Sequence, residues 1–156
     1  MTKDRIDQLI SITKEKNLLL NNIYNITKDQ KEEIERENME NLNRIMDEKD
    51  SLMKKIDELD LSFITIFSQI KKEHSIEGID ELSLEEYPNL TKLKEVVKEV
   101  SSTLMTISLM DDKNTGAMKE RLEQTKIELR KLKEGKKAYK GYNPSMNGSM
   151  LIDEKK

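Results

Sequence analysis

The sequence contains no cysteine and little proline or glycine, with two prolines and five glycines among 156 residues. Without cysteine the chain can form no disulfide and has no thiolate for catalysis or metal binding, which fits a reducing cytosol. Proline and glycine interrupt helices, so their scarcity leaves long stretches free to stay helical. They gather at a break that contains Gly78 and Pro88, and in a C-terminal segment with Gly135, Gly141, Pro144 and Gly148.

Aromatic residues are also scarce, at 4%, and apolar residues reach 35% against 38% charged residues. This is too little apolar material for a thick globular core, but it suits amphipathic helices that each bury one stripe. No apolar run approaches the ~20 residues that a membrane span needs, and the N-terminus lacks the apolar stretch of a signal peptide. The formal net charge of −3 disfavours a general nucleic-acid binder. We therefore expect a cytoplasmic protein with no nucleic-acid partner and no membrane insertion.

The residues that catalysis usually requires are missing as a set. His74 is the only histidine, and no suitably placed serine or cysteine accompanies it. The sequence has no glycine-rich phosphate loop and no histidine or cysteine group at metal-ligand spacing. The many acidic residues fall mostly on the expected solvent faces of helices. We expect a protein that is not an enzyme and that needs neither a metal nor a cofactor.

Apolar residues recur at helical spacing in three long segments, which we expect to be helices at about 2–37, 38–73 and 90–134. Asn38 follows a nearly all-polar run and is a suitable N-cap, so we expect the first and second helices to separate there. The second segment has the strongest pattern, with alternating steps of three and four that are typical of a coiled coil. Its positions are Leu42, Ile45, Lys49, Leu52, Ile56, Leu59, Phe63, Ile66 and Ile70.

The third segment keeps the same spacing across two polar positions, Asp111 and Asn114. Its positions are Leu90, Leu93, Val97, Val100, Leu104, Ile107, Asp111, Asn114, Met118, Leu122, Thr125, Leu129 and Leu132. Polar residues inside such a seam can fix the register of the helices. Lys49, in the second segment, has two simple interpretations: it contacts a partner, or it extends along its own helix to reach water. A third interpretation pairs Lys49 with Asp111 of the third helix.

The helical period is lost between residues 74 and 89, where we expect an acidic loop, with room for a short helical turn, that reverses the chain. The expected fold is therefore all-α, an elongated antiparallel helical hairpin or three-helix bundle with coiled-coil packing. We expect the second and third helices to pair antiparallel, with the first helix along them. Residues 1–134 would form this bundle, and residues 135–156 a flexible C-terminal tail.

The C-terminal part of the chain has apolar residues in a setting that suits recognition of another protein. Glycines and Pro144 interrupt the tail, which nevertheless keeps tyrosine, methionine and aliphatic side chains. Methionine adapts its shape to varied apolar partners. We predict a partner-binding surface that consists of Met118, Leu122, Leu129, Leu132, Tyr139, Tyr142, Met146, Met150, Leu151 and Ile152.

A basic cluster overlaps this surface and has two interpretations. It consists of Arg130, Lys131, Lys133, Lys136, Lys137 and Lys140. Cations near the C-terminus of a helix complement the helix dipole, which is the simpler interpretation. The alternative is an adaptor that docks on nucleic acid or a membrane, and that binding would weaken steeply with added salt.

The segment ENMENLNRIMDEKDSLMKKIDELD resembles the central signature of the FlgN-type flagellar secretion chaperones, a helix with a leucine-periodic run around a lysine. The matching positions are Leu42, Ile45, Lys49, Leu52, Met53, Ile56 and Leu59. The stretch MDDKNTGAMKERLEQ is similar to the family's third helix, with Asn114 in the seam. The tail is similar in style, through Tyr139 and Tyr142 and an ending with Ile152, Asp153 and Lys155. The FliT-type filament-cap chaperones are near relatives of similar size and composition.

This resemblance implies a type III export chaperone without a cofactor. Such a protein binds the C-terminal helical part of hook-associated (hook–filament junction) proteins and delivers them to the export ATPase and export gate components. We expect it to be a monomer or weak dimer. The alternative from the heptads alone is a structural coiled-coil scaffold that acts by self-association without chaperone activity.

Overall fold

The computed structural model describes residues 1–142, and the side chains of residues 1–136. In this part of the chain the regular elements are α1 (Thr2–Arg36), α2 (Met39–His74), the 3₁₀ turn η1 (Ile79–Glu81) and α3 (Leu90–Tyr142). The all-α expectation is confirmed. The chain forms two compact units, Met1–Asn114 and Thr115–Lys156, and among the helices of residues 1–142 α3 alone has residues in both.

The first two helices are separated by a tight reversal of two residues. Glu37 takes the left-handed conformation, with φ 58°, and its backbone N–H donates to carbonyl oxygens of the last turn of α1. Asn38 then caps α2, because its side-chain oxygen accepts a 3.2 Å hydrogen bond from the backbone N–H of Asn41. The expected N-cap at Asn38 is thereby confirmed.

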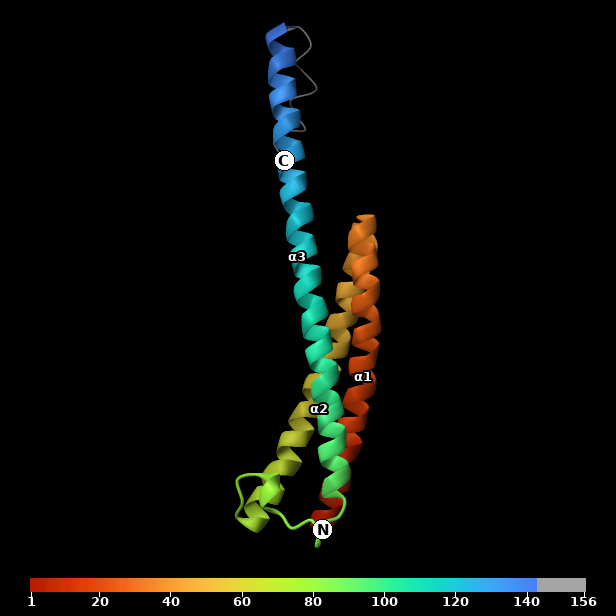
Figure 1. The fold of residues 1–156 in the computed structure, drawn as a ribbon, viewed down its shortest axis with the longest axis vertical. Helices are drawn as coiled ribbons and strands as arrows, with labels where there is room; N and C mark the ends of the chain where they lie inside the picture. Colours follow the sequence, from red (N-terminus) through yellow and green to blue (C-terminus); the bar gives the residue numbers. More distant parts are fainter. Residues whose placement is uncertain (143–156) are drawn as a thin grey trace. The chain divides into compact units, whose positions relative to one another are not determined.

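Within the first unit, α1 and the beginning of α3 run in one direction and α2 runs against both (Figure 1). The closest backbone approach is between α1 and α2, whereas the sequence analysis expected an antiparallel pair of α2 and α3 with α1 along it. The connections explain the difference. A two-residue reversal holds α1 and α2 side by side. The connection from α2 to α3 is longer, residues 75–89, and allows α3 to pack less closely against the other two helices.

Two clusters of buried apolar side chains hold the three helices of the first unit together. One lies at the end near the N-terminus and contains Ile6, Leu9, Ile10, Ile70, Leu82, Leu90, Leu93 and Val96. The other lies farther along the bundle and contains Leu20, Ile23, Ile56, Val100 and Ile107. Each cluster takes residues from α1, α2 and α3. Full burial of one such side chain contributes about 1.5–3 kcal/mol, so these clusters position α3 against the hairpin.

The seam of α3 differs in detail from the predicted one. Val96 is buried, whereas the predicted seam residues Val97 and Leu104 are 40% and 42% exposed. The buried residues Leu93, Val96 and Val100 keep the three-four spacing, but Val96 takes the buried position that the sequence pattern assigned to Val97. A shift of this size is possible because residues 96 and 97 both lie within reach of the broad face that packs between two helices.

The loop between α2 and α3 is secured to the start of α1. The side-chain amide of Asn89 donates to Asp7 (2.8 Å) and to the backbone carbonyl of Lys3 (3.0 Å). Thr2 and His74 form a 2.8 Å hydrogen bond between the ends of α1 and α2. The expected loop with a short helical turn is confirmed, and these contacts fix where α3 begins.

The carboxylate of Glu81 organises the turn at η1. Its Oε2 accepts hydrogen bonds from the backbone N–H groups of Gly78, at 3.0 Å, and Glu77, at 2.6 Å. These two hydrogen bonds, with that from Gly78 the larger cause, lower the pKa of Glu81 below its ordinary value, because they favour the ionised form.

The helix α3 extends to Tyr142, beyond the end expected near Glu134. Gly135 and Gly141 therefore lie inside the helix. A glycine in a helix interior destabilises it by about 1 kcal/mol relative to alanine, but it does not remove a hydrogen bond as proline does.

Candidate partner-binding surface

A polar layer joins all three helices near the end of the first unit. The ammonium group of Lys49 on α2 donates to Asp111 on α3, at 2.7 Å, and to the side-chain oxygen of Gln30 on α1, at 3.0 Å. One turn later, the amide of Asn114 donates to the backbone carbonyl of Thr27, at 3.2 Å. The pairing of Lys49 with Asp111 is thus confirmed, and Asn114 is a buried polar residue of the seam, as proposed from the sequence.

The apolar face of α3 continues along the helix past this layer. At 100° per residue, Met118, Leu122, Leu129 and Leu132 lie on the same side of α3 as the buried residues Val100 and Ile107. We call these four residues the α3 stripe. Residues 115–142 of the second unit consist of this single helical segment, so the described part of that unit contains no other helix to cover them.

The side chains of the α3 stripe are between 37% and 61% exposed, with Met118 the least and Leu132 the most exposed. An isolated helix in water gains little from its own hydrogen bonds, and most helix stability in proteins comes from packing of the apolar face. A row of exposed leucines on one face is therefore the pattern of a helix that acquires a partner. Four members of the predicted surface, Met118, Leu122, Leu129 and Leu132, share this row.

The other predicted residues cannot be placed with the stripe. Tyr139 and Tyr142 fall within α3, and their side chains lie outside the described residues. Met146, Met150, Leu151 and Ile152 also lie outside them. Their role in partner binding stays a prediction.

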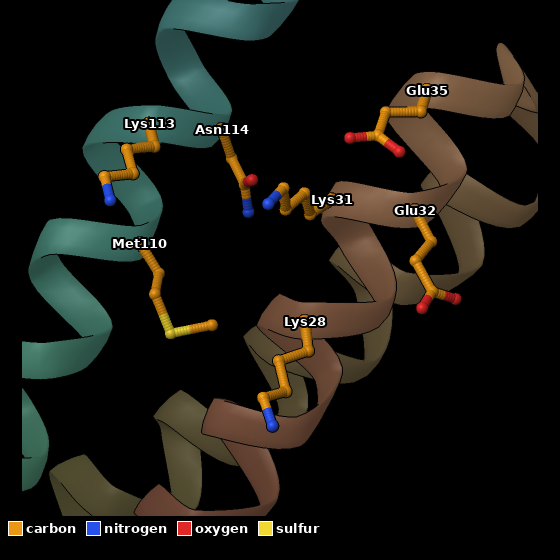
Figure 2. Close-up of a pocket in the computed structure, with 7 residues that line it drawn as sticks. All are labelled: Lys28, Lys31, Glu32, Glu35, Met110, Lys113 and Asn114. Carbon is orange, nitrogen blue, oxygen red and sulfur yellow. The ribbon is translucent and has the colours of Figure 1, made fainter.

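A second candidate surface was not predicted from the sequence. A notch of about 540 Å³ opens between α1 and α3, lined by Lys28, Lys31, Glu32, Glu35, Met110, Lys113 and Asn114 (Figure 2). We call it the α1–α3 notch. Exposed lysines on a helix usually indicate only a solvated face. That two lysines from α1 share a notch with one from α3 could not be predicted, because the sequence does not specify the register between these helices.

The described residues contain neither a candidate metal site nor a membrane span. Nowhere among them do three or more histidine or acidic side chains gather in a way that could hold a metal ion. None of the helices in the described chain has an apolar stretch long enough to cross a bilayer.

Comparison with known proteins gives a family match over most of the sequence. The family model described as FlgN protein matches residues 1–148, which include the whole first unit and most of the second. No curated protein and no solved structure shows a significant match to the chain.

Proposed function

The chain belongs to the FlgN family, whose members are flagellar export chaperones, and we propose that it binds hook-associated (hook–filament junction) proteins in the cytoplasm. It keeps these clients from assembling before export and delivers them to the export ATPase and export gate components. The α3 stripe carries the proposal. The family supplies the general role, and the stripe supplies a surface for an amphipathic client helix.

The chemistry of the stripe suits a helical client. A client helix with apolar residues at positions i, i+3, i+4 and i+7 can pack on the row formed by Met118, Leu122, Leu129 and Leu132. Burial of four such side chains contributes roughly 6–12 kcal/mol before costs, at about 1.5–3 kcal/mol each. Association itself costs an estimated 4–15 kcal/mol, so the net affinity is moderate and the complex can dissociate. Reversible binding is what a delivery protein requires.

The C-terminal residues extend the proposed surface. Tyr139, Tyr142, Met146, Met150, Leu151 and Ile152 supply further apolar contacts to the client, or to the export components at the moment of transfer. If this segment becomes ordered on binding, the entropy loss limits the affinity and assists release. No metal or nucleotide takes part in this proposal, and the chaperone acts by binding alone.

The decisive experiment measures binding of a purified hook-associated protein to the full chain by isothermal titration calorimetry. The double variant Leu122→Asp, Leu129→Asp places two charges on the stripe, and we expect it to weaken binding at least a hundredfold. The matched control is Ile127→Asp, which changes an exposed apolar residue of the same helix on the opposite side from the stripe. If the stripe variant binds the hook-associated protein as tightly as the unchanged chain does, the α3 stripe is not the client-binding surface.

A second experiment tests the C-terminal residues separately. Deletion of residues 139–156 should weaken client capture while the stripe remains. Retention of full affinity would show that these residues do not contact the client. The same deletion, assayed against the purified export ATPase and export gate components, distinguishes a role in transfer from a role in capture.

The alternative is a coiled-coil scaffold in which the stripe pairs with a second copy of the chain. The three-four spacing favours this possibility as much as it favours a client helix. Sedimentation equilibrium separates the two. A stable oligomer that the stripe variant dissociates supports the scaffold, and a monomer or weak dimer supports the chaperone.

A further inference from the structure

The α1–α3 notch combines cationic, apolar and buried polar groups from two helices. Lys28 and Lys31 stand on α1, and Lys113 stands on α3. Met110 is half-buried and Asn114 is 3% exposed. Figure 2 shows Lys31 extending from α1 toward Asn114, with Met110 on α3 on the same side of Asn114 as Lys28 on α1.

The three lysines form no ion pairs within the described residues. Other basic side chains there do, such as Lys16 with Asp60. Lys28 lies over the ring of Tyr24, 4.8 Å from its centre. These cations are therefore available to an anionic ligand, in a chain whose formal net charge is −3.

The carboxylates of the notch restrict which anionic partner can fit. Glu32 and Glu35 line the same notch from α1, and Figure 2 shows the Glu32 carboxylate directed away from Asn114. A phosphate backbone carries uniform, closely spaced negative charge, which these two carboxylates repel. A peptide carries separate charges, so it can place acidic side chains near the lysines and other side chains near the glutamates. Charge complementarity thus favours a protein partner over nucleic acid.

The floor of the notch indicates what else the partner needs. The thioether of Met110 is a flexible apolar group that adapts to different side-chain shapes. Two helices also border the notch, and an open cleft between helices accepts a third helix with an apolar anchor residue. An acidic helix that also carries a leucine can pair its carboxylates with the lysines and pack the leucine against Met110.

We propose that the α1–α3 notch is a docking site for an acidic, leucine-bearing helical segment of a partner protein, recognised by Lys28, Lys31, Lys113 and Met110. This site lies in the first unit and is separate in sequence from the α3 stripe. It therefore goes beyond the proposed binding of clients through the α3 stripe, and the two proposals can be tested separately. It gives the chaperone a means to recognise a second protein without releasing the first.

The test uses a fluorescein-labelled synthetic peptide of about four helical turns with glutamates and leucines at helical spacing. Its binding to the full chain is followed by fluorescence anisotropy at low salt. Two companion peptides replace all glutamates by glutamine or all leucines by alanine. We expect the glutamate–leucine peptide to bind, and both companions to bind at least about tenfold more weakly.

Two variants of the protein locate the binding site. The triple variant Lys28→Gln, Lys31→Gln, Lys113→Gln should weaken peptide binding about tenfold or more. The matched control, Lys14→Gln, Lys54→Gln, Lys98→Gln, neutralises three exposed lysines, one on each helix, that do not line the notch. We expect the control to bind as the unchanged chain does. Thermal unfolding should be the same for both variants, because none of the six lysines forms an ion pair within the described residues.

Three results would overturn the proposal. Equal weakening by the control variant would indicate general electrostatic attraction. Full competition by millimolar inorganic phosphate, with no effect of the leucine replacement, would indicate a simple anion site. If the Met110→Ser variant binds the glutamate–leucine peptide as strongly as the unchanged chain, Met110 is not the apolar contact that the proposal requires. The stripe variant Leu122→Asp, Leu129→Asp should bind this peptide normally, which separates this test from that of the proposed function.

Discussion

Lys49 on α2 and Asp111 on α3 form a 2.7 Å ion pair in which the lysine side chain is 11% exposed and the aspartate 43%. The two partners are therefore in different surroundings. The lysine depends on Asp111 and Gln30 for its hydrogen bonds, while the aspartate retains access to water.

This asymmetry predicts different effects for the two truncations. Asp111→Ala leaves a nearly buried ammonium group with Gln30 as its described partner, and should lower the free energy of unfolding by about 1–3 kcal/mol. Lys49→Met removes the charge but keeps the length of the side chain, and should change that free energy by less than about 1 kcal/mol. Urea denaturation followed by circular dichroism measures both. Equal destabilisation by the two variants would contradict the asymmetry.

The buried clusters predict a clear contrast between two residues of the same helix. Leu20→Ala removes a side chain that is 2% exposed inside the second cluster, and should destabilise the protein by about 2–5 kcal/mol. Leu18→Ala changes a side chain that is 67% exposed, and should alter the stability by no more than about 0.5 kcal/mol. Thermal denaturation of both variants provides the measurement. A large effect of Leu18→Ala would instead show that this residue is covered in solution.

The reversal between α1 and α2 predicts the effect of removing a helix cap. Asn38→Ala removes the acceptor for the Asn41 N–H and should destabilise the protein by about 1 kcal/mol. The control is Asn22→Ala, the same substitution at an exposed position inside α1, where alanine is the better helix former. Asn22→Ala should therefore be neutral or slightly stabilising in a denaturant titration. A neutral Asn38→Ala would show that another group caps α2.

The turn at Glu81 predicts a dependence on pH. The folded pKa lies below the ordinary value, so the ionised carboxylate stabilises the turn fully above the unfolded pKa of about 4.3. This contribution is lost as the pH falls through the lower folded value. Amide hydrogen exchange at Glu77 and Gly78, which donate to this carboxylate, should therefore lose protection as the medium is acidified through that range.

Substitution provides the control for this pH dependence. Glu81→Gln should lower the protection of the same two amides at neutral pH and leave it nearly independent of pH. Glu85→Gln, at an exposed position of the same loop, should retain the behaviour of the unchanged chain. Protection that is equal in all three proteins would mean that the Glu81 carboxylate does not organise the turn.

The sequence predicted the elements of the fold well because their signals are local. The Asn38 cap and the break between Gly78 and Pro88 depend on residues close together in the chain. The pairing of Lys49 with Asp111 was one of three interpretations that the polar seam positions left open, and the structure shows which one holds. The sequence did not indicate that α1 and α2 would approach most closely, because periodicity shows which face is buried and not which neighbour buries it.

Of the two candidate surfaces, only the one that lies on a single helix was predicted from the sequence. The α3 stripe was predicted because its apolar spacing continues along one helix. The α1–α3 notch was not, because Lys31 and Lys113 are distant in sequence and meet only through the register between two helices. The end of α3 was placed too early because the glycines and Pro144 were expected to interrupt the helix, whereas Gly135 and Gly141 lie inside it.

The two-residue reversal at Glu37 and Asn38 also has a consequence for the order of folding. Contacts between neighbours in the chain form faster than contacts that close a long loop. As the chain emerges from the ribosome, α1 and α2 can pair before Leu90 is made, and α3 joins them last. We therefore expect the segment that carries the α3 stripe to be added to a hairpin that has already formed.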